Sequence, residues 1–309
     1  MPNLFAVTAS TTLNLRSSPE LRPDNIIGAM PHGHIVTKLE DADPPFVKVS
    51  TTLAGETLTG FCSSNFLEPA ETEGSGGTTV VTLTEIDDGV RILKLANDKA
   101  VFFTSDMDID VDGAPNAYGP NESGLERNKN GKNKKGQFVA VVTDDNGNPI
   151  KQSTDDPFPG MFISTTTLFD PTKPRRSTLR YVNGVQVPYI VIPGQLVGGL
   201  MQMGDPALVI DLKTGEQVKA IVADAGPTRK TGEASAFLAA KITKQQTPVA
   251  SKKSFSNPRD GGTDERRFRY IIFPGRTLSW PQTNDAIETA VDDALADLSA
   301  AQLKAITTA

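Results

Sequence analysis

The stretch that decides the fold reads AIVADAGP at residues 220–227 and continues as TRKTGEAS at residues 228–235. An apolar run ends in the carboxylate of Asp224, and a Gly-Pro turn then redirects the chain. The Ala-rich stretch Gly232–Ile242 follows and carries a second carboxylate, Glu233, near its start. This order predicts a strand, a loop and a helix that opens at Glu233, with the two acids facing each other across a cleft.

Other apolar runs of strand length surround this stretch, and most of them are bounded by Gly, Pro or Asn. They are Ala100–Thr104, Phe138–Val142, Tyr189–Ile192, Ala207–Ile210, Val218–Val222 and Tyr270–Phe273. Together they predict a β-rich domain. We expect this domain to be the larger of two, mainly β with a few helices.

Helical periodicity marks the C-terminal tail. Its apolar residues three or four positions apart are Ile287, Val291, Leu295 and Leu298. Ser299 and Gln302 match a capping box that would open a last short helix over Ala300–Ile306. Two interpretations stay open: a helix docked on its own domain, and a helix that binds a partner.

Shorter β-type runs fill the N-terminal part, as expected for a small barrel. They are Phe5–Ala9, Thr12–Arg16, Ile26–Met30, Ile35–Leu39, Phe46–Ser50 and Gly60–Cys62. The polar, glycine-rich sequence ETEGSGGTT then indicates a flexible linker. We therefore expect a small domain over 1–70, a linker over 71–79, a large domain over 80–282 and a helical tail over 283–309.

Composition narrows the possible partners. The 309 residues include 31 Lys and Arg against 37 Asp and Glu, a net charge of −6, which disfavours nucleic acid and favours a cationic partner. One cysteine, Cys62, and two histidines, His32 and His34, exclude a disulfide framework and argue against a metal centre. We expect no cofactor and no membrane span, because no apolar run approaches about 20 residues. The start lacks a secretion signal, so we expect a cytosolic protein or a signal already removed.

Acidic and apolar residues alternate in DMDIDVDG, which begins at Asp106. In a strand this period places Asp106, Asp108, Asp110 and Asp112 on one face. The row is interpreted in three ways: a solvated edge strand, a surface for a cationic ligand, or a calcium loop. The calcium pattern is incomplete, because Gly119 stands where an EF-hand needs its bidentate acid.

Paired carboxylates such as Asp224 and Glu233 are what glycoside hydrolysis requires, one as acid and the other as base or nucleophile. A helix opening at Glu233 would favour its ionised form, and the apolar residues before Asp224 would desolvate it and raise its pKa. We therefore expect Asp224 to be the acid and Glu233 the base.

Five motifs occur in an order that resembles the fungal-type chitosanases of glycoside hydrolase family 75. They are DMDIDVDG at 106–113, VPYIVIPG at 187–194, AIVADAGP at 220–227, TGEASAFLA at 231–239 and YIIFPG at 270–275. The resemblance, over about residues 85–278, implies endo-hydrolysis of β-1,4 linkages in chitosan by an inverting mechanism, with Asp224 and Glu233 as the catalytic pair. It also implies secretion. Chitosan carries ammonium groups, so Asp106, Asp108 and Asp110 are the candidate substrate-binding residues. By analogy with other polysaccharide-active enzymes, we expect a double-psi barrel.

The N-terminal part resembles a bacterial Src-homology-3-like domain. The likeness rests on LNLRSSP at 13–19, IG at 27–28, GHIV at 33–36 and GFCSSNFL at 60–67. The resemblance implies binding of cell-wall material, although Phe46 and Phe61 stand where tryptophans are usual. Two other functions stay open: a peptidoglycan-directed hydrolase, and a non-catalytic protein that binds cell wall or carbohydrate.

Overall fold

A computed structural model describes residues 3–9, 11–53, 56–69, 78–86, 89–126, 130–246, 254–259, 261–280 and 282–308. Contacts divide the chain into two compact units, one formed by residues 1–85 and 91–96 and the other by residues 86–90 and 97–308. Most of the predicted linker, residues 71–77 of 71–79, lies outside the described residues.

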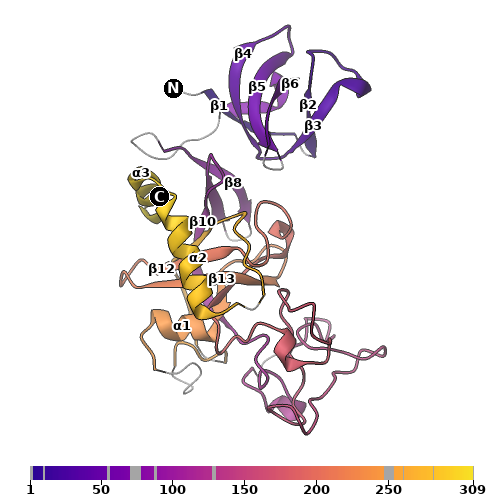
Figure 1. Ribbon diagram of the computed structural model, residues 1–309, viewed down its shortest axis with the longest axis vertical. Helices are drawn as coiled ribbons and strands as arrows, with labels where there is room; N and C mark the ends of the chain where they lie inside the picture. Colours follow the sequence, from indigo (N-terminus) through magenta and orange to yellow (C-terminus); the bar gives the residue numbers. More distant parts are fainter. Residues whose placement is uncertain are drawn as a thin grey trace. The chain divides into compact units, whose positions relative to one another are not determined.

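The first unit contains an antiparallel seven-stranded sheet in the order β3-β2-β6-β5-β4-β1-β7 (Figure 1). Its strands are β1 (Asn3–Val7), β2 (Thr12–Arg16), β3 (Ile26–Pro31), β4 (Ile35–Asp41), β5 (Phe46–Leu53), β6 (Glu56–Ser63) and β7 (Leu67–Pro69). Each of the six predicted N-terminal runs overlaps one of these strands. Alternation along β2 explains the core of this unit. Leu13 and Leu15 are buried, whereas Thr12 at the start of the strand is exposed and Asn14 between the leucines is only partly buried. A hairpin of β8 (Val80–Ile86) and β9 (Val90–Leu95) follows.

The second unit is built on six strands that close into a barrel. They are β10 (Val101–Asp110), β11 (Tyr189–Pro193), β12 (Pro206–Asp211), β13 (Gln217–Gly226), β14 (Glu233–Ser235) and β15 (Thr263–Ile272). Their order is β14-β11-β13-β12-β15-β10, and pairing of β14 with β10 closes the circle. The β10–β14 and β11–β13 pairs are parallel, whereas the other pairs are antiparallel. The mainly β fold expected from the sequence is confirmed.

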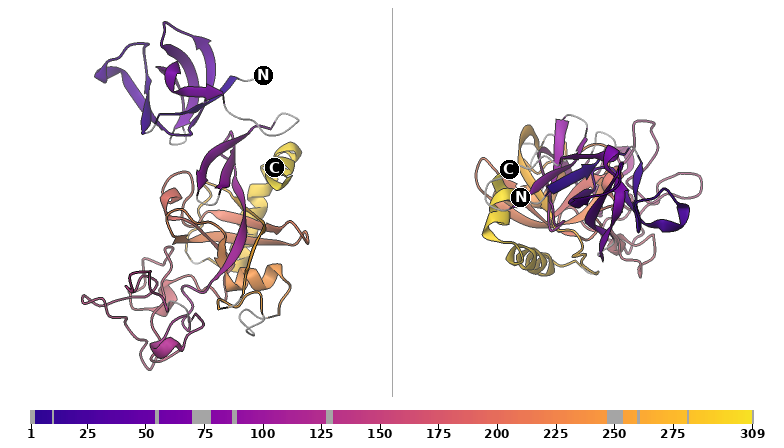
Figure 2. Two further views of the ribbon diagram at one scale, coloured as in Figure 1. Left: turned by 180° about the vertical axis from the view of Figure 1, so that it is seen from behind. Right: turned by 90° about the horizontal axis from the view of Figure 1, so that it is seen from above.

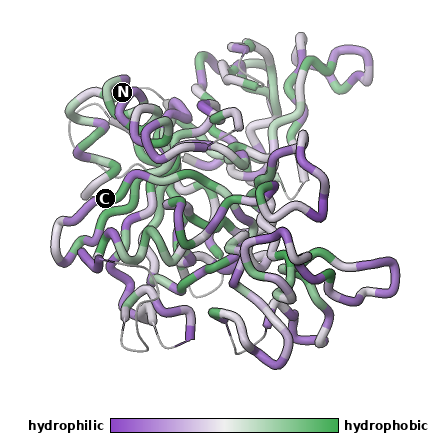
Figure 3. The backbone as a smooth tube through the Cα atoms, turned by 60° about the horizontal axis from the view of Figure 1, so that its bottom comes forward, coloured by the Kyte–Doolittle hydropathy of each residue, from purple (hydrophilic) through white to green (hydrophobic). Residues whose placement is uncertain are grey.

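Helices cover the outside of this barrel (Figures 1 and 2). Helix α1 (Ala236–Ile242) contacts β10, β13 and β14, and α2 (Asn284–Ala296) contacts β12 and β13. Because both faces of the central strands are covered, all six residues of β12 are buried. Apolar, green segments gather toward the middle of the view in Figure 3. The capping box is confirmed: Ser299 and Gln302 exchange hydrogen bonds of 2.9 and 3.2 Å before α3 (Ala300–Thr308).

A long irregular segment, residues 111–188, joins β10 to β11. The strand predicted over Phe138–Val142 is wrong, because Phe138 and Val141 make only isolated bridges, to Lys132 and Ser164. Their side chains pack in one cluster with other residues of this segment, with Ile109 of β10 and with Ala236 of α1. The apolar run is only five residues long, which is too short to distinguish a strand from an irregular segment that packs in a local cluster.

Candidate functional site

Asp224 lies near the carboxyl end of β13, just after an irregularity in its pairing with β11. The side chain is buried, and its Oδ1 accepts hydrogen bonds from the Thr167 amide (2.9 Å), the Thr167 hydroxyl (2.5 Å) and the Ala225 amide (2.8 Å). Burial raises the pKa of Asp224, and these three donors oppose the shift without cancelling it. The carboxyl group is thus firmly oriented and retains its proton to higher pH than a free aspartate.

Glu233 lies in β14, and the prediction that it opens a helix is wrong. Strand β14 pairs with β10 on one side and with β11 on the other, and α1 begins only at Ala236, capped by the Ser235 hydroxyl. The sequence could not show this, because both partner strands lie far away in the chain. The argument that a helix dipole favours ionised Glu233 therefore falls.

Strand β11 brings Asp224 and Glu233 together. Val191 is in register with Asp224 on β13 and with Glu233 on β14, so the two acids flank one residue. Two interstrand spacings place their Cα atoms about 9–10 Å apart. A Cβ atom built on Gly226 would lie 3.3 Å from Glu233 Oε2, so the Glu233 carboxyl group reaches toward the end of β13. Both acids also raise the pKa of buried Asp110, after the larger effect of its burial.

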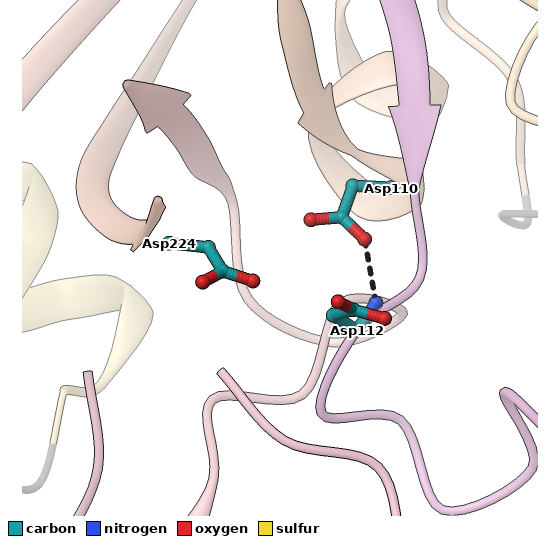
Figure 4. A group of neighbouring side chains, drawn as sticks. All are labelled: Asp110, Asp112 and Asp224. Carbon is teal, nitrogen blue, oxygen red and sulfur yellow. Dashed lines mark hydrogen bonds between the residues drawn. The ribbon is translucent and has the colours of Figure 1, made fainter. Parts of the chain in front are cut away.

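Asp110, Asp112 and Asp224 form a carboxylate cluster, with side chains that point toward one another (Figure 4). One carboxylate oxygen from each lies within 4.8 Å of the others. Asp110 Oδ1 accepts a 2.8 Å hydrogen bond from the Asp112 amide, and Asp112 Oδ1 accepts one of 2.5 Å from the Tyr118 hydroxyl. Burial first, and then the neighbouring acids, raise the pKa values of Asp110 and Asp112 well above the ordinary range. The cluster therefore retains protons, and a hard divalent cation is the other species that its oxygens could hold.

The other two acids of the predicted row lie in a different environment. Asp108 is about half exposed and forms an ion pair with Lys230, while Asp106 accepts a 3.0 Å hydrogen bond from Ser105. Burial lowers the pKa of Lys230, but Asp108, Glu233 and Asp106 outweigh it and raise the pKa overall. The row is thus split into a surface part neutralised by Lys230 and a buried part beside Asp224. Because Asp108 and Asp110 belong to a strand, the EF-hand-like pattern does not form a calcium loop.

Gly232 holds the loop close to this row. Its φ of +82° is in the left-handed region, and a Cβ atom there would lie 1.9 Å from Asp106 Oδ1. The Gly232 carbonyl oxygen accepts a 2.6 Å hydrogen bond from the Asp108 amide. Only glycine fits this contact between loop and strand.

Three residues of the site were not predicted. Asp112 belongs to the quoted acidic motif, and the same alternation that selected Asp106 could have selected it. Thr167 and Lys230 lie in irregular segments without periodicity, so only the folded structure places them beside Asp224 and Asp108.

The histidines have local partners in the first unit. His32 Nδ1 lies 3.1 Å from the Ala9 carbonyl oxygen, and His34 Nε2 lies 2.5 Å from the Thr51 hydroxyl. Burial raises the pKa of the free Cys62 thiol to about 11. Among the described residues, the aspartate cluster alone gathers three potential metal ligands.

Comparison with known proteins adds no relative: no protein-family model matches the chain, and no curated protein compared with it does. Within the described ranges, no helix is long and apolar enough to cross a membrane.

Proposed function

We propose that the chain is an endo-acting glycoside hydrolase that cleaves β-1,4 linkages of chitosan by inversion, with Asp224 and Glu233 as the catalytic pair. The observation that carries the proposal is their shared register with Val191, one on each side of β11. Inverting enzymes hold their carboxyl groups about 6.5–9.5 Å apart, so that water fits between sugar and base. A Cα separation of about 9–10 Å, from two strand spacings, is compatible with that requirement.

Asp224 is proposed as the acid and Glu233 as the base. Asp224 is buried and its pKa is raised, so it retains a proton for the leaving oxygen. Glu233 interacts with the ammonium group of Lys230, and as the second carboxylate of the pair it is the group proposed to activate water. This reason replaces the helix-dipole argument and leads to the same assignment.

The acids around Lys230 support a cationic substrate. Its ammonium group interacts with Asp108, Glu233 and Asp106, and the amino group of a glucosamine unit has the same chemistry. Asp106 and Asp108 are therefore proposed to contact substrate. Asp110 lies beside Asp224 in the carboxylate cluster, so we propose that it influences the protonation of Asp224 and does not pair with the substrate.

The finer architecture is also a proposal. A closed six-stranded barrel with two parallel pairs supports a double-psi arrangement, and the antiparallel sheet of the first unit supports a Src-homology-3-like module. Phe46 is buried and cannot stack on sugars, which favours guiding of substrate over tight carbohydrate binding.

The test measures release of reducing ends from chitosan, chitin oligomers and purified peptidoglycan by the parent chain, Asp224→Asn and Glu233→Gln. Asp155→Asn, at an exposed aspartate, is the matched control. We expect chitosan cleavage that falls about 10²–10⁴-fold in both site variants and stays unchanged in the control. NMR of the first-formed anomer tests inversion. If the parent chain cleaves peptidoglycan but not chitosan, it is a cell-wall hydrolase. If the parent chain cleaves none of the three substrates, the alternative of a non-catalytic binding protein replaces the proposal.

A further inference from the structure

A concave site lies in the same unit as the carboxylates. It is a cavity of about 450 Å³, a size typical of small-molecule sites. Its walls contain no charged side chain and consist of Pro115, Asn116, Pro157, Phe158, Thr178, Leu179, Tyr181, Val182, Asn183, Val185, Gln186, Val187, Trp280 and Gln282. We call this site the neutral pocket.

Aromatic and amide groups dominate the neutral pocket. Trp280, the single tryptophan of the chain, lines it with Tyr181 and with Phe158, which is 43% exposed. Aromatic rings next to side-chain amides suit the apolar face and the polar edge of a sugar ring. An ammonium group would lose its water there without gaining a counter-charge.

Gln282 supplies an independent indication of a ligand. Its side chain is about nine-tenths buried, and its Nε2 donates to the Leu278 and Ser279 carbonyl oxygens at 3.3 and 3.0 Å. Its Oε1 is buried and has no hydrogen-bond donor within the described residues. A buried oxygen without a donor is unusual in folded proteins, and a ligand N–H or O–H group would satisfy it.

The neutral pocket shares a wall with the carboxylate cluster. The Asp112 carbonyl oxygen accepts hydrogen bonds from the Gly184 amide (3.0 Å) and the Tyr189 hydroxyl (3.1 Å), and Asn183 and Val185 beside Gly184 line the pocket. Asn116, another lining residue, follows Asp112 by four positions. The two sites are therefore close together in the fold, as binding of one polymer chain to both would require.

We propose that the neutral pocket binds an uncharged N-acetylated amino-sugar unit. The ring stacks on Trp280, and the acetamido and hydroxyl groups bind the amide side chains, including Gln282. The inference rests on the proposed function and deepens it: the acids bind glucosamine units, while the neutral pocket selects an acetylated unit along the same chain. Partly acetylated chitosan and the glycan of peptidoglycan both contain such units.

The test uses the full chain carrying Glu233→Gln, so that the oligomers stay intact. Titration with the trimer of N-acetylglucosamine should change Trp280 fluorescence, whereas the glucosamine trimer should leave it unchanged. By calorimetry, Trp280→Ala should weaken binding of the acetylated trimer about tenfold, and Trp280→Phe should restore much of it. Phe169→Ala, at a 40% exposed aromatic residue outside the pocket lining, is the matched control.

Two results would contradict the proposal that the neutral pocket binds an acetylated unit. One is an unchanged affinity of Trp280→Ala for the acetylated trimer, and the other is an equal fluorescence response to both trimers. The proposed function can fail separately. If the chain binds the acetylated trimer at Trp280 but cleaves no chitosan, the proposed hydrolase activity is wrong and the proposed sugar site stands. If the chain cleaves chitosan but does not bind the trimer, the proposed sugar site is wrong and the hydrolase activity stands. Comparison of the acetylated trimer with the N-acetylglucosamine–N-acetylmuramic acid disaccharide identifies the polymer from which the unit comes.

Discussion

At the scale of single residues, Asp110, Asp112 and Asp224 share a region in which three full negative charges would repel one another. Raised pKa values mean that the folded chain retains protons that the unfolded chain releases above about pH 4. The stabilisation is complete below that pH and is lost as pH rises through the folded-state pKa values. The folded state should therefore be more stable at pH 5 than at pH 8.

Asp112→Asn should reduce this pH dependence. The amide oxygen can still accept from Tyr118, while one charge disappears. We expect the variant to exceed the parent at pH 8 by about 2–4 °C in Tm, roughly 1 kcal/mol, and to differ little at pH 5. Melting curves between these pH values measure the effect. A constant difference at all pH values would mean that the cluster does not titrate as its burial indicates.

A second prediction at the residue scale concerns Lys230. Lys230→Met removes the cation that neutralises Asp108 and Asp106, so glucosamine oligomers should bind about two- to fivefold more tightly at low salt. The gain should fade at high salt because of screening. Calorimetry at two salt concentrations measures it, with fully acetylated oligomers as the uncharged control. Weaker binding would instead make Lys230 a direct contributor to substrate affinity.

Residue types revealed the pair Asp224 and Glu233, because an acid after an apolar run and another beyond a Gly-Pro turn are visible in the sequence. The alternation of the acidic motif predicted four equivalent carboxylates, and here it failed. Strand period says which face a side chain is on, but not that β10 ends at Asp110, that Asp110 is the one buried acid of the row, or that Asp112 lies beyond the strand.

At the scale of elements, the three-residue strand β14 explains the main error. No periodicity can be recognised in three residues, and the Ala-rich sequence that follows predicts a helix from Gly232 onward. Long periodic segments were predictable: α2 buries Ile287 and Val291 at the expected spacing. An element such as α2, whose own sequence carries a periodic apolar pattern, could be predicted. A strand such as β14, which forms only because β10 and β11 lie beside it, could not.

Gly232→Ala tests how closely the loop before β14 must approach β10. The added Cβ atom would meet Asp106 Oδ1 at 1.9 Å, in addition to the cost of a positive φ. Gly147→Ala is the control, because Gly147 has a φ of +79° and nothing within 4 Å of the new atom. Denaturant unfolding should show about 1–3 kcal/mol lost in the control and a larger loss in Gly232→Ala. Equal losses would mean that the loop can move away from Asp106 without cost.

At the scale of the whole molecule, every strand of the barrel comes from residues after 100. Removal of residues 1–75 should therefore leave a folded chain that cleaves short soluble oligomers at roughly the parent rate. Circular dichroism checks the fold of the truncated chain, and assays on soluble oligomers check its activity. Comparing the truncated and parent chains on insoluble polymer then measures how much the first unit contributes to activity on that substrate. Insoluble expression would show that the barrel needs the removed residues to fold.

Strand β14 also has a consequence for the order of events during folding. Its three residues join β10 to β11, segments separated by the whole 111–188 region, and the pairing of Asp108 with Glu233 connects positions 125 residues apart. Closure of the barrel therefore depends on contacts of high sequence separation. Asp224 and Glu233 come to face each other only at that step. A brief local opening at β14 would therefore separate the two proposed catalytic acids without unfolding the molecule.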